Sequence, residues 1–282
     1  MSDVILNFGK GLDEYLTKEQ IKNSAPLVFA DAPTNPDVSN KYLFVNTETI
    51  IDDLEKLGWL PVQAAQRKSR KVGGTIFSKH MVSFQNPNIK ITSNDGDDAY
   101  PRILLTNSHD GMQAFKFSVG IFRLVCSNGL VVADEQFSDF KIKHKGYTFG
   151  ELRKVVKQAV ADLPNKVQVM NDMKNRILTL EEKNKLALDA MLIRANITPG
   201  SDKAKKFNYD DETIEDILEP KRKEDKGDDL WRVFNVVQEK ITQGEFSAAL
   251  KGAKVRKVRK IKSFEKDIKV NQELFKLATS VI

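Results

Sequence analysis

The 282-residue sequence has little of several residue types, and each scarcity excludes a class of protein. Its single cysteine, Cys126, excludes an internal disulfide bond and is typical of a protein kept in a reducing compartment. No stretch approaches the roughly 18 consecutive apolar residues that a membrane-spanning helix requires, so we expect no membrane partner. The N-terminus has neither the basic segment nor the long apolar core of a signal peptide. These observations together predict a cytoplasmic protein.

Sequence motifs that mark metal and nucleotide sites are also missing. The histidines His80, His109 and His144 are too scattered, relative to one another and to Cys126, for a zinc site built from closely spaced ligand pairs. The acidic turn at 94–98 lacks the ligand spacing and the closing glutamate of a calcium loop. No glycine-rich loop ends in Lys-Ser or Lys-Thr, as a phosphate-binding loop does. The sequence therefore predicts no metal and no cofactor.

Two short segments could be interpreted as catalytic. His109 stands beside Asp110, as a general base stands beside an orienting carboxylate, and Cys126 could be a thiol nucleophile. Each lies close to a β-hairpin turn signal, Asp110-Gly111 or Asn128-Gly129, which explains the segment without catalysis. We therefore interpret both residues as structural and assign no catalytic residue, which leaves enzymatic activity undecided and favours a binding protein.

The middle of the chain alternates apolar and polar residues with the period of two that predicts β-strands. The runs with this pattern are 59–66, 75–85, 102–106 and 114–125. Turn signals containing Gly96, Gly111 and Gly129 separate or follow them, because Asp-Gly and Asn-Gly pairs tolerate the positive φ of a tight hairpin turn. The simplest arrangement is an antiparallel β-meander.

Helical patterns dominate the chain after residue 148. Thr148 and Thr179 are each followed three residues later by glutamate, and this capping box predicts two helix N-termini. Two further helices are expected near 230–241 and 263–278. The predicted fold class is therefore α+β, with an antiparallel β-meander packed with long helices and a helical C-terminal region.

The same patterns divide the chain into consecutive parts. We expect an N-terminal segment (1–41), a mainly β core domain (42–148), a helical part of the core (149–198), an acidic linker (199–228) and basic C-terminal helices (229–282). In the helical part, Met170, Met173 and Ile177 form an apolar stripe that exceeds what a single sheet would cover. Such an excess favours a homo-oligomer, in which a second copy buries the stripe.

Positive charge is concentrated in two clusters. The net charge is +6, and the last 32 residues contain ten basic and three acidic residues. One cluster, 251–262, lies within these last residues. The other, 67–71, lies between two predicted strands, where a hairpin tip would present it to a partner. The residues that we expect to contact a nucleic-acid backbone are Arg67, Lys68, Arg70, Lys71, Lys254, Arg256, Lys257, Arg259, Lys260 and Lys262.

The C-terminal cluster allows two interpretations. Val255, Val258 and Ile261 recur every third residue, which suits a helix with one apolar edge and a wide basic face. This helix would bind an anionic partner such as nucleic acid, because Lys and Arg neutralise phosphates. Alternatively, it would pack against the acidic segment that precedes it in the chain. Both interpretations stay open at this point.

Six segments of the chain carry a resemblance to a known family. They are 58–62 (GWLPV), 79–82 (KHMV), 105–111 (LTNSHDG), 122–130 (FRLVCSNGL), 231–235 (WRVFN) and 271–275 (NQELF). In this order they resemble a domain-of-unknown-function family carried by bacteriophages, prophages and conjugative plasmids, over roughly Tyr42 to Ala278. The resemblance implies a bacterial host cell and a mobile genetic element, and it implies no activity. A β-meander followed by a long helix, with basic loops, is also similar in architecture to phage single-strand annealing proteins.

These observations favour a nucleic-acid-binding protein of a phage or plasmid. Single-stranded DNA is the expected partner, and annealing in recombination or replication is the expected process. One alternative is a metal-dependent nuclease, whose acidic residues would come together from distant strands and leave no local pattern. The other is a non-enzymatic factor that binds host defence proteins.

Overall fold

A computed structural model gives the structure of the chain. It describes residues 4–7, 15–35, 38, 44–67, 78–110, 115–123, 131–132, 140–142, 147–207, 209–244, 246–250 and 254–282. The strands are β1 (Val4–Asn7), β2 (Leu60–Gln66), β3 (His80–Gln85), β4 (Lys90–Ser93), β5 (Ala99–Asn107), β6 (Phe115–Arg123), β7 (Val131–Val132), β8 (Phe140–Ile142), β9 (Ser247–Ala248) and β10 (Arg256–Lys257). The helices are α1 (Lys18–Ser24), α2 (Thr47–Lys56), α3 (Phe149–Ala161), α4 (Leu163–Asn175), α5 (Leu180–Arg194), α6 (Asp211–Leu218), α7 (Leu230–Gln243) and α8 (Phe264–Thr279), with 3-10 turns η1 (Pro26–Phe29) and η4 (Ala204–Lys206).

The main sheet is antiparallel and is built around β5. This strand pairs with β3 along one edge and with β6 along the other, while β2 pairs with β3. The predicted meander is therefore confirmed, with one addition: β4 pairs with the start of β5 at Ile91 and Ala99 and carries β1 on its outer side. Gly96 adopts a φ of 79° in the turn between β4 and β5, as the turn signal predicts. The turns at Gly111 and Gly129 lie outside the described residues.

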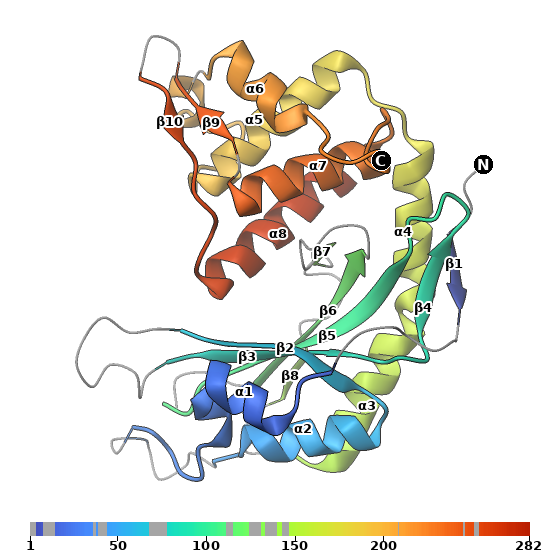
Figure 1. Cartoon of the computed structure of the whole chain (residues 1–282), viewed down its shortest axis with the longest axis vertical. Coiled ribbons are helices and arrows are strands. Elements are labelled where there is room, and N and C mark those ends of the chain that lie inside the picture. Colours follow the sequence, from blue (N-terminus) through green and yellow to red (C-terminus); the bar gives the residue numbers. More distant parts are fainter. Residues whose placement is uncertain are drawn as a thin grey trace.

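One face of the sheet packs against α1, α2 and α3 (Figure 1). Alternate residues of the strands, among them Val82, Phe84 and Ile103, are buried there with Leu54 of α2 and Leu152 of α3. Thr148 caps α3 as expected, because its side chain accepts a hydrogen bond from the backbone N–H of Glu151. The α+β fold class follows from this sheet and its helices.

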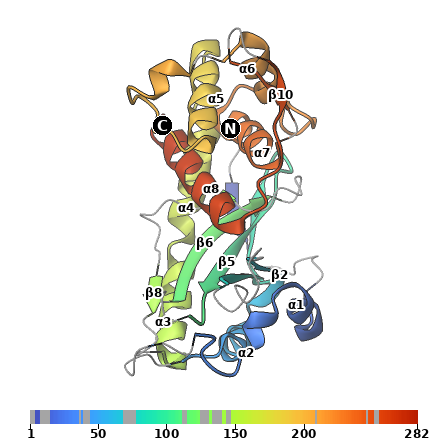
Figure 2. The ribbon, with the colours of Figure 1, turned by 90° about the vertical axis from the view of Figure 1, so that its left-hand side faces the viewer.

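The helices from α4 onward form a second core at the other end of the molecule (Figures 1 and 2). Met170 and Met173 of α4 are fully buried there with Trp231 and Phe234 of α7 and Leu274 of α8. The chain therefore covers both methionines of the apolar stripe with its own helices. The third member, Ile177, is 61% exposed, so it is the one residue of the stripe that a second copy could still bury, and the homo-oligomer stays a prediction.

A buried network of charged groups joins the sheet to the second core. Arg123 of β6 is 1% exposed, and its Nε and Nη1 atoms lie 2.7 Å and 2.9 Å from carboxylate oxygens of Asp97 and Asp225. The indole N–H of Trp231 donates to the other oxygen of Asp97 over 2.7 Å. Because the partners come from β6, the β4–β5 turn, α7 and the segment before α7, the network fixes the helical core on the sheet.

Candidate nucleic-acid interface

The C-terminal basic cluster is an extended arm, not a helix. We define the basic arm as residues 254–262; it runs from β10 to the start of α8 (Figure 1). Its strand pairs with β9, in the register Arg256 opposite Ala248. The helix predicted from the three-residue spacing is therefore wrong, because β9 offers backbone hydrogen bonds and β-branched valines favour an extended chain. Of the three apolar residues, only Ile261 is buried, while Val255 is 58% exposed.

Contacts with α5 and α7 hold the arm in place. The backbone N–H of Ile261 donates to the carbonyl of Thr242 over 2.8 Å, and that of Val258 donates to Phe246 over 2.9 Å. Arg194, the last residue of α5, donates from its guanidinium to the carbonyls of both Ile241 and Arg259. The arm therefore has a defined backbone position before any partner binds.

Gly244 makes the close approach of the arm possible. It ends α7 with a φ of 73°, a left-handed conformation that favours glycine. A Cβ atom at this position would lie 2.4 Å from the backbone carbon of Arg259 and 2.8 Å from the nitrogen of Lys260. Only glycine satisfies both the backbone angle and the contact.

The cations of the arm are exposed and are not paired inside the described part of the chain. All six of the predicted arm residues are solvent-exposed, and no described carboxylate forms a salt bridge with any of them; they are Lys254, Arg256, Lys257, Arg259, Lys260 and Lys262. The acidic segment finds other partners: Asp216 lies 2.8 Å from Lys240 of α7, and Asp225 binds Arg123. The interpretation in which the basic segment packs against the acidic one therefore has no support among the described residues.

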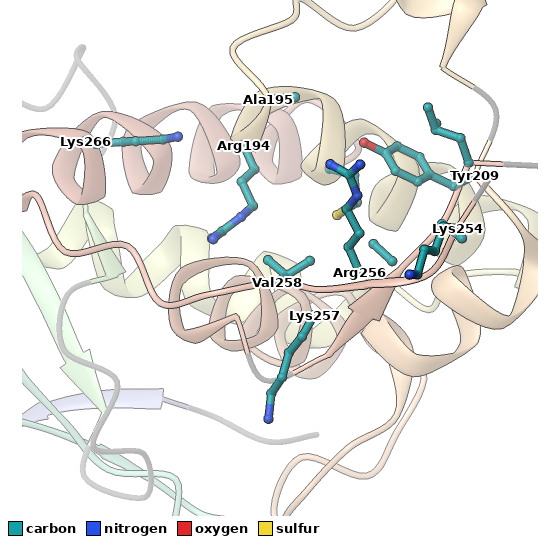
Figure 3. A pocket seen from close by; sticks show the side chains of 12 residues that line it. Arg194, Ala195, Tyr209, Lys254, Arg256, Lys257, Val258 and Lys266 are labelled. Carbon is teal, nitrogen blue, oxygen red and sulfur yellow. The ribbon is translucent and has the colours of Figure 1, made fainter.

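Hollows border the arm on two sides. The first has a volume of about 530 Å³ and lies between the arm and α5; it contains Arg194, Lys254, Arg256, Lys257 and Lys266 (Figure 3). The second, about 780 Å³, lies between the arm and the end of α7 and is lined by Gln243, Gly244, Val258 and five arm cations. Neither described lining contains an Asp or a Glu. All charged side chains among the described lining residues of both hollows are therefore positive.

Arg67 of the other basic cluster lies beside the end of the arm. Its guanidinium is 3.8 Å from Glu265 in the first turn of α8, and Lys79 is 2.7 Å from the same carboxylate. The backbone N–H of Arg67 also donates to the carbonyl of Lys79 over 2.8 Å, which closes the base of the segment between β2 and β3. The structure thus brings the start of one predicted cluster next to the end of the other. Lys68, Arg70 and Lys71 lie outside the described residues.

One carboxylate does act on the charge of this region. Asp267 lies in α8 near Arg194 and Lys260. Burial raises the pKa of Asp267 to about 6, although attraction to Lys260 and Arg194 opposes the rise. At neutral pH it is mostly ionised and tempers the positive potential, and below pH 6 it becomes neutral.

His109 lies in a cluster of polar side chains between α2 and the sheet. It is fully buried, and its Nε2 atom is 3.3 Å from the hydroxyl of Thr47, which also lies 2.9 Å from Nε2 of His80. Asn46 caps α2, and the hydroxyl of Thr47, the first residue of the helix, accepts a hydrogen bond from the side-chain amide of Asn107. Burial lowers the pKa of His80 to about 3. These groups are all buried and contact one another between α2 and the sheet. Cys126 lies outside the described residues.

Several residues of the candidate site escape sequence reasoning. Arg194, Tyr209 and Lys266 line the first hollow, yet each is far from the arm cluster in the chain or separated from it by a helix start. Nothing in the local sequence distinguishes them from other surface residues. Within the described ranges, no group of three or more His, Cys, Asp or Glu side chains could hold a metal ion.

The protein is therefore of the α+β class, and its basic arm, which links α7 to α8 in the chain, presents an exposed cationic surface. No helix in the described part of the chain is both long and apolar enough to span a membrane. The chain belongs to the family described as Domain of unknown function (DUF932), whose model matches residues 37–275 and so includes strands β2 to β10 and the arm. It is similar to the UPF0380 proteins YafZ and YfjQ of Escherichia coli (strain K12). Each is 27% identical over 273 residues, which cover 96% of this chain and 93% of the relative. No solved structure matches the chain.

Proposed function

We propose that the protein binds nucleic acid, preferentially single-stranded DNA, along the basic arm. The observation that carries this proposal is the set of six exposed arm cations that form no salt bridge with any described carboxylate. Lys and Arg contacts with phosphates release condensed counterions and provide the sequence-independent part of nucleic-acid affinity. A surface that bound no anion would gain nothing from keeping so many like charges together.

The fixed backbone of the arm adds to this argument. Hydrogen bonds from Ile261 and Val258, and the guanidinium of Arg194, order the arm in the free protein. Binding then costs less conformational entropy than it would for a loose basic tail. Arg67 and Lys79 lie near the end of the arm, where they share the single carboxylate of Glu265 and so add one net positive charge.

For the biological process we propose strand annealing during recombination or replication of a phage or plasmid. The support for this process is the resemblance in sequence and architecture, together with a surface that would follow a strand without cleaving it. The nuclease alternative gains no support from the described residues, which contain no cluster of metal-ligating groups.

Salt-dependent binding tests the proposal directly. Fluorescence anisotropy with a labelled single-stranded oligonucleotide should show affinity that falls steeply with salt, by a logarithmic slope of about 0.7 per phosphate contact. The arm variant replaces four cations by glutamine, at Arg256, Lys257, Arg259 and Lys260. If all four contact phosphates, the slope should fall by about 3 and the stability should stay unchanged, because exposed charges contribute little to folding.

A matched control removes four exposed cations from the opposite end of the molecule. Its glutamine substitutions are at Lys22, Arg153, Lys154 and Lys157, on α1 and α3. This control lowers the net charge by the same amount and should keep most of the affinity and the salt slope. If the parent protein shows no binding at low salt, the nucleic-acid proposal is wrong and the protein-interaction alternative takes its place. If control and arm variant lose affinity equally, net charge and not the arm is responsible.

A further inference from the structure

The hollow between the arm and α5 has an apolar wall as well as its cations. Met191 of α5 and Ala249 are buried, and the side chains of Leu250 and Val258 continue this wall. A phosphate group needs only hydrogen-bond donors and positive charge, so the apolar wall calls for another kind of group. The volume of about 530 Å³ falls in the range of pockets that hold small organic ligands.

Tyr209 supplies an aromatic ring to this hollow. Its backbone forms a β-bridge with Leu250, and the next residue, Asp210, donates its backbone N–H to the carbonyl of Ala249 over 3.1 Å. These contacts fix the root of the side chain. In Figure 3 the side chains of Tyr209 and Arg256 both extend over the hollow. Burial raises the pKa of the Tyr209 hydroxyl, so the ring is neutral at every ordinary pH.

The cations lie around this wall and ring. Lys254, Arg256 and Lys257 come from the arm, and Lys266 comes from the first turns of α8. The guanidinium of Arg194 is already bound to two backbone carbonyls, so we assign it a positioning role. The hollow therefore combines an apolar wall, one aromatic face and a cationic rim that carries no described carboxylate.

We propose that this hollow takes one unstacked base of a single strand, while the phosphates on either side of that base contact Lys254 and Arg256. This inference rests on the proposed function and adds to it the reason for single-strand preference. A base has an apolar face that can stack on an aromatic ring, and each base is flanked by phosphates. In a duplex the bases are paired and stacked, so a duplex offers the phosphates but not the base. An acidic peptide would match the cations but not the aromatic face.

Two strands of equal length and charge test the inference. One is an oligothymidylate, and the other has the same backbone with abasic sites in place of the bases. Stacking on aromatic side chains makes a contribution per base that corresponds to about five-fold to a hundred-fold in affinity. The parent should therefore bind the oligothymidylate at least about five-fold more tightly, with the same salt slope for both strands, because the phosphate contacts are the same.

Three variants assign this difference to the hollow. Tyr209→Leu removes the ring and should abolish the preference for base-bearing strands, whereas Tyr209→Phe keeps the ring and should retain the preference. Ala195→Phe fills the hollow from an exposed position at the end of α5 and should act like Tyr209→Leu. All three should keep the salt slope of the parent, and thermal melting confirms that each is folded.

The outcomes separate this inference from the proposed function. Equal affinity of the parent for both strands, with a normal salt slope, would overturn the base pocket and leave nucleic-acid binding by the arm intact. A preference that persists in both Tyr209→Leu and Ala195→Phe would also overturn it, because the base would then bind elsewhere. Absence of binding to either strand would reject both proposals, and binding of an acidic peptide in place of DNA would assign the hollow to another partner.

Discussion

Replacing Gly244 by alanine should displace the basic arm without unfolding the molecule. The new Cβ atom would lie 2.4 Å from the backbone carbon of Arg259, so the arm must move by about 1 Å before this contact reaches an ordinary 3.4 Å. Such a shift weakens two hydrogen bonds, from Ile261 to Thr242 and from Arg194 to Arg259. Each contributes about 1 kcal/mol net, and the left-handed backbone costs alanine about 1 to 2 kcal/mol more. We therefore expect a loss of about 2 to 4 kcal/mol in the free energy of unfolding.

Gly200→Ala is the matched control for this experiment. Gly200 has a φ of 79°, close to the 73° of Gly244, but no atom lies within 4 Å of its added Cβ. It should lose only the backbone contribution, about 1 to 2 kcal/mol. Urea unfolding measures both variants, and amide hydrogen exchange should show faster exchange at Ile261 and Val258 in Gly244→Ala alone. If the two variants lose the same stability and protect the arm amides equally, the arm is not held against α7 as described.

Two further predictions concern buried groups. The variant His80→Gln should lose less stability in acid than the parent. The folded parent holds His80 neutral with a pKa of about 3, so its unfolded chain binds one more proton than the folded chain below pH 6.5. The free energy of unfolding of the parent should therefore fall by up to about 1.4 kcal/mol per pH unit more than that of the variant between pH 6 and pH 4, and parallel pH profiles from urea titrations would contradict this. Arg123→Met should cost about 3 kcal/mol, because it leaves the buried carboxylates of Asp97 and Asp225 with fewer partners. Lys154→Met, which breaks an exposed salt bridge with Glu151, should cost less than about 1 kcal/mol in the same denaturation assay, and equal losses would refute the role of the network.

The binding surface itself has consequences at lower pH. Asp267, with a pKa of about 6, is the carboxylate that acts on Arg194 and Lys260 beside the arm. When Asp267 is protonated, the potential around the arm becomes more positive. The fold therefore couples the charge of the proposed interface to the protonation of Asp267 in α8.

Local signals in the sequence determined much of the secondary structure. The capping box at Thr179 starts α5, because its side chain and that of Glu182 satisfy backbone N–H groups within one turn. The turn at Gly96 and the period-two runs of β3 and β5 likewise depend on residues only a few positions apart. Each of these features rests on steric limits and hydrogen bonds inside a short segment, so one sequence suffices to find them.

The tertiary structure alone decided what the basic residues and the apolar stripe do. The arm is extended because β9 and the end of α7 offer it hydrogen bonds, which the spacing of Val255, Val258 and Ile261 does not reveal. Met170 and Met173 are buried by helices that follow much later in the chain. Arg67 meets Glu265, and Tyr209 meets the arm, only because folding brings distant segments together. A sequence fixes which groups a chain carries, but long-range packing determines which of them share a surface, since that depends on partners whose positions no short segment specifies.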